Sequence, residues 1–399
     1  MMEKRRILVV SHALELGGAE RALLGLLGAF DAEQYDIDLF LLRHSGELLP
    51  YIPKHVRLLP EIKQYTCLAE PIGATLRKAA FPVALGRAWG KYAARRFLAS
   101  HPSDLDQGVS LEYSHKYTKR FMPKISTEQY DLAISFLTPH YFVAEKVNAK
   151  KKIAWIHTDY SALHIDAESE IKMWSAYDRI ASISDQCTAG FLKKFPSLRD
   201  RIIRIDNITL PSLICQQGDA EPPVGMETGM YKLLSVGRFC NQKNFDNVPD
   251  ICRILHKAGY DVHWYLIGFG GDEALIRRKI IETGTEDFIT ILGKKTNPYP
   301  YMKACDLYVQ PSRYEGNCVA VHEAQILGKP VVITRYATSA SQLEDGIDGV
   351  IVPIDNEGCA AGIAALLKSP ARMSYLSQGC KSRDYSNREE AKKLYQLLG

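Results

Sequence analysis

Two glutamates eight residues apart could bind the hydroxyl groups of a ligand. Glu315 and Glu323 flank the segment 316–322, which follows an apolar strand predicted at 307–310 and enters a helix ending near Gly328. Ligands of parallel α/β sheets bind at the carboxyl ends of strands. A carboxylate accepts two hydroxyl hydrogen bonds at once, so Glu323 suits a ribose diol and Glu315 suits sugar hydroxyls. For the pair alone, two ordinary surface glutamates are an equally good interpretation.

A basic pair, Arg238 and Lys243, directly follows the apolar strand predicted at 232–236. Arg238 offers a planar guanidinium and Lys243 a point charge, and both suit a diphosphate. Such cations can neutralise the negative charge that develops on a departing nucleoside diphosphate. A solvated basic loop is the slightly favoured interpretation of this pair alone.

Two further features follow strands in the first half of the chain. Gly17 and Gly18 come after the strand predicted at 6–11, and glycines allow a ligand to approach the backbone closely. They do not form a dinucleotide fingerprint, and a structural glycine turn is the commoner case. His157 ends the strand predicted at 152–156, where it could bond a sugar hydroxyl or simply be a capped histidine.

The strands that position these residues alternate with helical segments along the whole chain. A first set is predicted at 6–11, 36–42, 130–136, 152–156, 179–183 and 202–205, and a second at 232–236, 262–267, 288–292, 307–310, 330–334 and 349–352. Such alternation predicts parallel sheets covered by helices on both faces. The expected α/β architecture is two doubly wound, Rossmann-like domains at 1–211 and 230–380, joined by a Gly- and Pro-containing linker at 212–229. The final segment, 381–399, is expected to form a helix that could pack on either domain, with the first domain as the expected partner.

Composition excludes several classes of protein. The 399 residues are 46% hydrophobic and 24% charged, which is typical of a soluble globular protein. No apolar run reaches the ~18 residues of a membrane span, and the apolar run at 7–10 is too short for a signal peptide, so we expect a cytoplasmic location. A net charge of +4 does not suggest a nucleic-acid partner, and nine scattered cysteines suggest neither disulfides nor a metal site.

One stretch of the chain is basic. No acidic residue occurs between Glu70 and Asp104. In a helix the cations that recur every four residues would share one face, and an apolar set would form another. Such a helix, within the region Arg77–Arg96, could lie on an anionic membrane or receive a lipid-diphosphate acceptor, with a basic solvated helix as the equally weighted alternative. The cations are Arg87, Lys91 and Arg95, and the apolar set is Ala84, Leu85, Ala88 and Tyr92.

Taken together and in this order, these motifs resemble the retaining GT-B glycosyltransferases of family 4, the glycosyl transferases group 1. The resemblance covers nearly the whole chain and rests on the residues already described, together with Asn207, which is similar to the asparagine that closes the family's first domain. One departure is the pair Asn317-Cys318, because many relatives have Phe-Gly there. This departure leaves the donor sugar open.

The resemblance implies an acceptor-side domain at 1–211 and a nucleotide-sugar-binding domain at 230–380, facing each other across a cleft. It implies retention of anomeric configuration, no metal and no other cofactor. Expected catalytic residues are His157, near the reacting carbon, and Glu315, on the transferred sugar. Expected donor-binding residues are Gly17, Gly18, Arg238, Lys243, Gly293, Lys294, Asn317, Cys318, Val319 and Glu323.

The expected reaction is transfer of a hexose or N-acetylhexosamine from a nucleotide diphosphate sugar, with UDP favoured, to a glycan or lipid-linked acceptor of the cell surface. Two alternatives stay open: a nucleotide-sugar epimerase of the same architecture, and a non-catalytic nucleotide-sugar-binding protein. A Rossmann dehydrogenase is a weaker candidate, because neither Gly17-Gly18 nor Gly268-Phe269-Gly270-Gly271 carries the full dinucleotide fingerprint.

Overall fold

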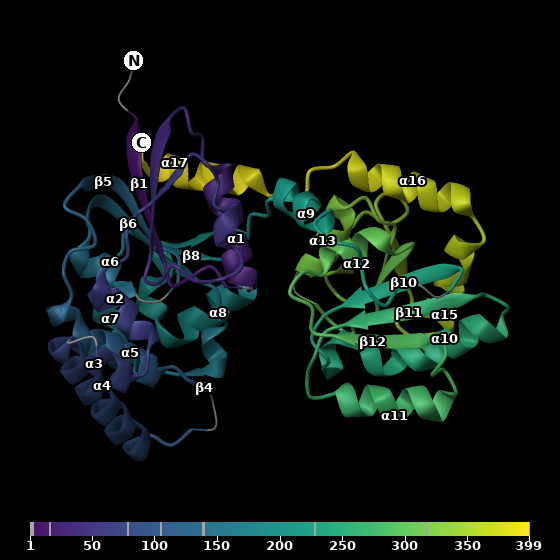
Figure 1. Ribbon diagram of the computed structural model, residues 1–399, viewed down its shortest axis with the longest axis horizontal. Helices are drawn as coiled ribbons and strands as arrows, with labels where there is room; N and C mark the ends of the chain where they lie inside the picture. The colour runs from purple at the N-terminus through teal and green to yellow at the C-terminus, as the bar shows by residue number, and fades with distance from the viewer. Residues whose placement is uncertain are drawn as a thin grey trace. The chain divides into compact units, whose positions relative to one another are not determined.

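The chain divides into two compact units. The computed structural model describes residues 4–15, 17–77, 80–103, 106–137, 140–226, 229–315 and 318–398 (Figure 1). Unit 1 consists of Met1–Leu210 together with Ser386–Gly399, and unit 2 of Pro211–Tyr385.

Unit 1 is built on a seven-stranded parallel sheet. The strand order is β3-β2-β1-β5-β6-β8-β9. The strands are β1 (Arg5–Ser11), β2 (Tyr35–Leu41), β3 (Val56–Leu58), β5 (Gln129–Ser135), β6 (Asn148–Ile156), β8 (Arg179–Ser182) and β9 (Ile202–Arg204), with a separate pair β4 (Asp106–Gln107) and β7 (Leu163–His164). The central strands read as continuous apolar runs because helices cover both faces of such a sheet.

Nine α-helices of unit 1 lie in the described residues. They are α1 (Gly18–Ala29), α2 (Lys63–Thr66), α3 (Ile72–Arg77), α4 (Phe81–Ser100), α5 (Val109–Thr118), α6 (His140–Lys146), α7 (Ala167–Trp174), α8 (Asp185–Lys194) and α17 (Lys392–Leu398). The main core contains fully buried Phe40, Phe142 and Trp174. The C-terminal segment is fixed to this unit by Tyr395, whose ring stacks on Tyr35 at a centroid distance of 4.7 Å.

Unit 2 is built on a six-stranded parallel sheet in the order β12-β11-β10-β13-β14-β15. The strands are β10 (Tyr231–Val236), β11 (Val262–Ile267), β12 (Ile289–Gly293), β13 (Leu307–Gln310), β14 (Val331–Thr334) and β15 (Val350–Val352). The helices are α9 (Pro211–Gly218), α10 (Val248–Lys257), α11 (Glu273–Thr283), α12 (Tyr299–Ala304), α13 (Val319–Ile326), α14 (Ser339–Gln342), α15 (Asn356–Leu367) and α16 (Pro370–Lys381).

Successive strand residues of unit 2 point to opposite faces of the sheet and build two cores. Leu233 and Trp264 belong to the core shared with α10, α11 and α15, whereas Leu234 and Tyr265 belong to the core shared with α9, α12 and α13. Figure 1 shows α10, α11 and α15 together beside β10–β12. The predicted α/β class with two doubly wound sheets is therefore confirmed.

The twelve predicted strands are confirmed within a few residues, because buried parallel strands have a strong apolar signal. The predicted linker 212–229 differs from the structure: residues 211–218 form α9, and its Leu213 and Ile214 are buried. The apolar side of α9 packs on α12 and α13 and so orders a segment whose Gly and Pro content predicted a loop. Strand β3, with the sequence Val-Arg-Leu at one edge of the sheet, was not predicted.

The predicted faces of the basic helix are wrong in part. Arg87 does not share a solvated face with Lys91, because its guanidinium donates to the carbonyl oxygens of Cys67, at 2.6 Å, and Glu70. The predicted apolar face is divided: Ala84 is buried, whereas Leu85, Ala88 and Tyr92 are exposed. The buried side of α4 is instead formed by small residues, namely Val83, Ala84, Gly86, Gly90 and Ala94. Glycine at 86 and 90 allows α4 to approach α5 closely, and this contact sets the rotation of the helix.

Candidate functional site

The loops that follow β10 and β13 meet at the point where the strand order of unit 2 reverses. From β10 the chain continues to β11 on one side, and from β13 it continues to β14 on the other. Such switch points are where open α/β sheets bind their ligands. Both residue pairs that the sequence analysis selected are attached to these two loops.

Lys243 and Glu315 form a buried ion pair between the two loops. Lys243 Nζ lies 2.6 Å from Glu315 Oε1, and their side chains are 16% and 4% exposed. Glu315 also accepts hydrogen bonds from Gln242 Nε2 at 3.0 Å and Ser312 Oγ at 2.6 Å. Burial disfavours the ammonium charge, but Cys318 and Glu315 outweigh it and raise the pKa of Lys243 above its usual value. Lys243 is therefore a fixed, charged donor at the switch point.

Arg313 forms a second connection between the loops, and its role was not predicted from the sequence. Its guanidinium binds both carboxylate oxygens of Asp246 at 2.9 Å and donates to the carbonyl oxygen of Asn241 at 2.6 Å. Asn244, in the left-handed conformation at φ 61°, donates from Nδ2 to the carbonyl oxygen of Pro311 at 2.8 Å. An arginine between a strand and a glutamate-containing loop gives no distinctive sequence pattern, so only the fold reveals this role.

The start of α13 differs in part from the expectation that Cys318 and Val319 bind the donor. The Cys318 amide donates to Gln342 Oε1 at 2.7 Å, so this amide already has a partner inside the protein. The Cys318 side chain is buried, with its sulfur 3.6 Å from Lys243 Nζ. Val319 is exposed at the first position of the helix, whereas Asn317 lies outside the described residues.

Glu323 lies within α13 and is only 5% exposed. Its Oε1 accepts a hydrogen bond from the hydroxyl of Tyr299, at 2.6 Å, which belongs to the neighbouring helix α12. Tyr299 was not predicted from the sequence to be a site residue. This hydroxyl fixes the orientation of the carboxylate.

The remaining donor-side candidates of unit 2 lie at the same edge of the sheet. Arg238 is exposed in the loop after β10, and within the described part of the chain its side chain forms no ion pair. Gly293 has φ +71°, a conformation that favours glycine, and a Cβ there would meet nothing within 4 Å. Lys294 is exposed, with Nζ 5.1 Å from the ring centroid of Phe269, which is itself 55% exposed.

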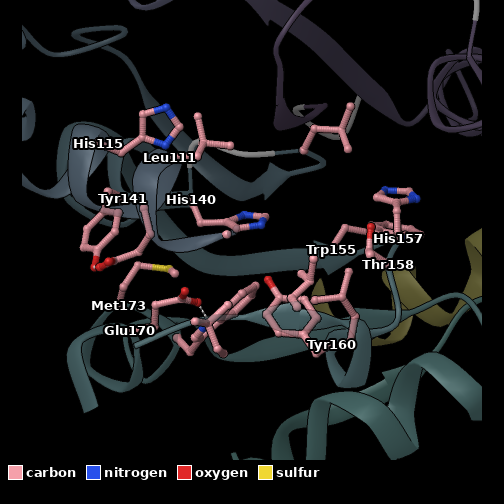
Figure 2. A pocket seen from close by; sticks show the side chains of 17 residues that line it. Leu111, His115, His140, Tyr141, Trp155, His157, Thr158, Tyr160, Glu170 and Met173 are labelled. Carbon is pink, nitrogen blue, oxygen red and sulfur yellow. Dashed lines mark hydrogen bonds between the residues drawn. The ribbon is translucent and has the colours of Figure 1, made fainter. Parts of the chain in front are cut away.

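His157 lies in unit 1, after β6, and lines a cavity of about 310 Å³. Its Nε2 is 2.9 Å from the carbonyl oxygen of Phe136. Burial lowers the pKa of His157 to about 4, so the imidazole is neutral at pH 7. A neutral ring whose Nε2 donates to Phe136 presents Nδ1 as a hydrogen-bond acceptor. Figure 2 shows His157 at one end of the lining and Glu170, Tyr141 and Met173 at the other.

The glycine pair opens α1 at the carboxyl end of β1. Gly17 is the residue before the helix, and a Cβ there would lie 2.1 Å from Glu20 Oε2. Gly18 is exposed, and a Cβ there would meet nothing within 4 Å. A side chain at Gly17 therefore conflicts with the protein itself, whereas Gly18 leaves open space above the helix start.

The chain is similar to known glycosyltransferases. The family model described as glycosyl transferases group 1 matches residues 219–383. The amylovoran biosynthesis glycosyltransferase AmsK of Erwinia amylovora is 30% identical over 144 residues, which cover 34% of this chain and 35% of AmsK. A Campylobacter jejuni protein is 29% identical over 126 residues, covering 31% of this chain and 34% of its own length. Its name is N-acetylgalactosamine-N,N'-diacetylbacillosaminyl-diphospho-undecaprenol 4-alpha-N-acetylgalactosaminyltransferase.

This chain thus matches about a third of the length of these two relatives. A solved structure matches over a much longer region: that of an S. aureus TarM mutant in complex with fondaparinux, alpha-GlcNAc-glycerol and UDP. It has a TM-score of 0.63 at 13% identity and covers 99% of this chain and 100% of that one. Residues 219–383 are therefore similar to the glycosyl transferases group 1 family, and the chain as a whole has the GT-B fold.

Proposed function

We propose that this chain is a retaining glycosyltransferase that moves a hexose or N-acetylhexosamine from a nucleotide diphosphate sugar to a glycan or lipid-linked acceptor. UDP is the expected nucleotide, and the product would belong to cell-surface polysaccharide or glycolipid synthesis. The names of the relatives support this class of reaction, since one belongs to amylovoran biosynthesis and the other acts on a diphospho-undecaprenol. UDP is present in the matched TarM structure.

The observation that carries the proposal is the buried Lys243–Glu315 pair at the switch point of unit 2. An ammonium group has three donors, so Lys243 can keep Glu315 and still donate to a phosphate oxygen. Exposed Arg238 would add a second cation. Together they would stabilise the charge on the departing nucleoside diphosphate, which is the role a divalent cation would otherwise fill. We therefore include metal independence in the proposal, with retained transfer in excess EDTA as its test.

The other donor groups have complementary roles in this proposal. Glu323, oriented by Tyr299, would accept hydrogen bonds from the ribose hydroxyls. Glu315 would accept hydrogen bonds from the transferred sugar. The neutral His157 would accept a hydrogen bond from a sugar hydroxyl near the reacting carbon through Nδ1.

The test is a thermal shift panel of UDP-, GDP-, ADP- and dTDP-sugars on the full chain, followed by product analysis with the sugar that binds. A ligand that binds only the folded state raises the melting temperature. We expect a UDP-sugar to raise it in the wild type and not in Lys243→Ala. An epimeric nucleotide sugar formed without an acceptor would instead establish the epimerase, and absence of binding by the whole panel would refute the proposal.

We also propose that α4 places the enzyme on an anionic membrane surface, where a lipid-linked acceptor would be found. No helix in the described ranges is long and apolar enough to cross a bilayer. Four large apolar side chains of α4 nevertheless face solvent, next to the exposed cations Lys91, Arg95 and Arg96. A helix with exposed aromatic and basic side chains suits the membrane interface. The four are Phe81, Leu85, Trp89 and Tyr92, exposed by 62%, 60%, 57% and 59%.

A further inference from the structure

The loop that carries Glu315 is held by the segment that follows the neighbouring strand. This Glu315 loop comprises residues 311–318, between β13 and α13, and its described residues form neither helix nor strand. The bracing segment, residues 334–342, begins at the last residue of β14 and ends with α14. Because β13 and β14 are adjacent parallel strands, both segments leave the sheet at the same edge.

Three side chains of the bracing segment donate hydrogen bonds to three backbone carbonyl oxygens of the Glu315 loop. The donors are four residues apart along the chain, and the carbonyl groups that accept are three residues apart. The course of the loop is therefore fixed by side chains from outside it. The bonds are Thr334 Oγ1 to Ser312 at 2.5 Å, Thr338 Oγ1 to Glu315 at 2.6 Å and Gln342 Nε2 to Cys318 at 3.3 Å.

Gln342 binds both polar groups of the Cys318 backbone. The Cys318 amide donates to Gln342 Oε1 at 2.7 Å, while Gln342 Nε2 donates to the Cys318 carbonyl oxygen. Gln342 is only 5% exposed, so water does not replace these bonds easily. A carboxamide offers an acceptor and a donor side by side. A carboxylate at this position would lack the donor, and an aliphatic side chain would lack both groups.

The two ends of the Glu315 loop contact the same ammonium group. Lys243 Nζ lies 2.6 Å from Glu315 Oε1 and 3.6 Å from Cys318 Sγ. Lys243 and Arg238 themselves belong to a different loop, the one after β10. A displaced Glu315 loop would therefore move the carboxylate proposed for the transferred sugar more than the cations proposed for the diphosphate.

These hydrogen bonds could serve only the stability of unit 2, as most buried hydrogen bonds do. Their distribution favours a more specific role. All three converge on one short loop without regular structure, and the middle bond holds the carbonyl group of Glu315 itself. The bond from Gln342 holds the residue that directly precedes α13, the helix that carries Glu323.

We propose that Gln342 and Thr338 are positioning residues, which hold the Glu315 loop in the conformation that contacts the sugar of the nucleotide-sugar donor. Both would act through Glu315 and Cys318. The role toward the sugar rests on the proposed transferase function, whereas the holding of the loop does not depend on it. Neither residue was predicted from the sequence to be a site residue.

The first test is calorimetric binding of UDP and four UDP-sugars to the full chain. Gln342→Leu removes both hydrogen bonds to Cys318, and Thr338→Val removes the bond to Glu315 while keeping the shape of the side chain. Each should weaken binding of the preferred UDP-sugar by about five- to tenfold and of UDP by less than about twofold. A general loss of structure would weaken both equally. The sugars are glucose, galactose, N-acetylglucosamine and N-acetylgalactosamine.

Gln342→Glu adds a readout that depends on pH. A protonated carboxyl group has the donor and the acceptor of the carboxamide, whereas the carboxylate only accepts and would face the Cys318 carbonyl oxygen. Burial favours the protonated form. The affinity of Gln342→Glu for the UDP-sugar, relative to the wild type at the same pH, should therefore rise severalfold from pH 8 to pH 5. A constant ratio would overturn the assignment of Gln342.

Hydrogen exchange of the full chain tests the loop without any ligand. In the wild type the Cys318 amide is protected by Gln342 Oε1. Gln342→Leu should speed its exchange by about tenfold or more, measured on a peptide that contains Cys318, while exchange in β14 stays at the wild-type rate. The matched control is Gln378→Leu, at an exposed glutamine on α16 of the same unit, which should change neither exchange nor binding.

The outcomes separate this inference from the proposed function. A wild type that binds neither UDP nor any of the four UDP-sugars would refute the transferase and the role toward the sugar, while faster exchange in Gln342→Leu would still assign the holding of the loop to Gln342. The inference is overturned if Gln342→Leu and Thr338→Val bind like Gln378→Leu, if they weaken UDP and the UDP-sugar equally, or if Cys318 exchange is unchanged in Gln342→Leu.

Discussion

Lys243 Nζ lies 2.6 Å from Glu315 Oε1, and both side chains are largely buried. The pair joins the loops after β10 and β13. It places the Lys243 ammonium group at the switch point and neutralises it with the Glu315 carboxylate. Removing one partner leaves the other charge buried and unpaired, which typically costs roughly 3–5 kcal/mol.

Lys243→Ala should therefore lower both stability and nucleotide affinity. We expect the urea unfolding midpoint to fall and UDP binding by calorimetry to weaken by more than about tenfold, since a charge-assisted phosphate contact is lost as well. Arg277→Ala is the matched control, because it removes a cation from the exposed pair with Glu273 and should cost well under about 1 kcal/mol. If both substitutions changed stability and UDP affinity equally, Lys243 would have no specific role in nucleotide binding.

Glu323 and the nucleotide ribose give a second prediction. If Glu323 accepts hydrogen bonds from the ribose hydroxyls, wild-type enzyme should bind UDP several-fold more tightly than 2′-deoxy-UDP. Glu323→Gln should reduce that ratio toward one, and Tyr299→Phe should reduce it in part because the carboxylate loses its orientation. Calorimetric titration with both nucleotides measures the ratio. An unchanged ratio in Glu323→Gln would show that Glu323 only supports α13.

The buried Glu170 predicts a pH dependence of stability. Its folded-state pKa is raised to about 8, so the folded protein holds this proton above the pH at which the unfolded chain releases it. Below the unfolded-state pKa near 4.5, Glu170 does not reduce the free energy of unfolding, because it is protonated in both states. Between pH 4.5 and 8 only the folded state keeps the proton, so the free energy of unfolding falls by up to about 1.4 kcal/mol for each pH unit.

Glu170→Gln keeps an acceptor for Trp174 and removes the titration. From pH 5 to pH 8 the unfolding free energy of the wild type should therefore fall relative to that of Glu170→Gln. Urea unfolding at each pH measures it, with Glu168→Gln as the exposed control on α7. The prediction fails if the two glutamine variants have parallel pH profiles.

The exposed apolar face of α4 predicts membrane binding that depends on lipid charge. The double substitution Leu85→Ser and Trp89→Ser should reduce co-sedimentation with phosphatidylglycerol vesicles severalfold, and added salt should reduce that of the wild type. Ile281→Ser, at another exposed apolar position, 67% accessible on α11, is the control. Equal pelleting of the wild type with phosphatidylcholine and phosphatidylglycerol vesicles would contradict the proposed surface.

The strands and the donor loops could be predicted from the sequence because each has a local cause. Continuous apolar runs such as 7–10 are typical of strands in a parallel sheet that is covered on both faces. Arg238, Lys243, Glu315 and Glu323 follow such runs at short distances, so the strand ends bring them to one edge.

The remaining features depend on contacts between distant segments. Helix α9 forms because Leu213 and Ile214 find an apolar surface on α12 and α13, which the sequence of 211–218 does not reveal. Glu112 and Glu170 resemble ordinary helix glutamates, since glutamate is rarely buried without a partner. Their partners, Tyr141 and Trp174, become visible only once α5, α6 and α7 are packed together.

The return of the C-terminal segment to unit 1 makes unit 2 an insertion within another domain. The backbone amide of Thr209 donates to the carbonyl oxygen of Ser386 at 2.8 Å, so the chain leaves and re-enters unit 1 at neighbouring points. Ala391 and Leu394 are buried, which means that a fragment ending at Leu210 would expose an apolar surface. A self-contained unit 1 would therefore need a short loop joining Leu210 to Ser386. The same two junctions would allow residues 211–385 to be exchanged as one segment with the corresponding domain of a relative.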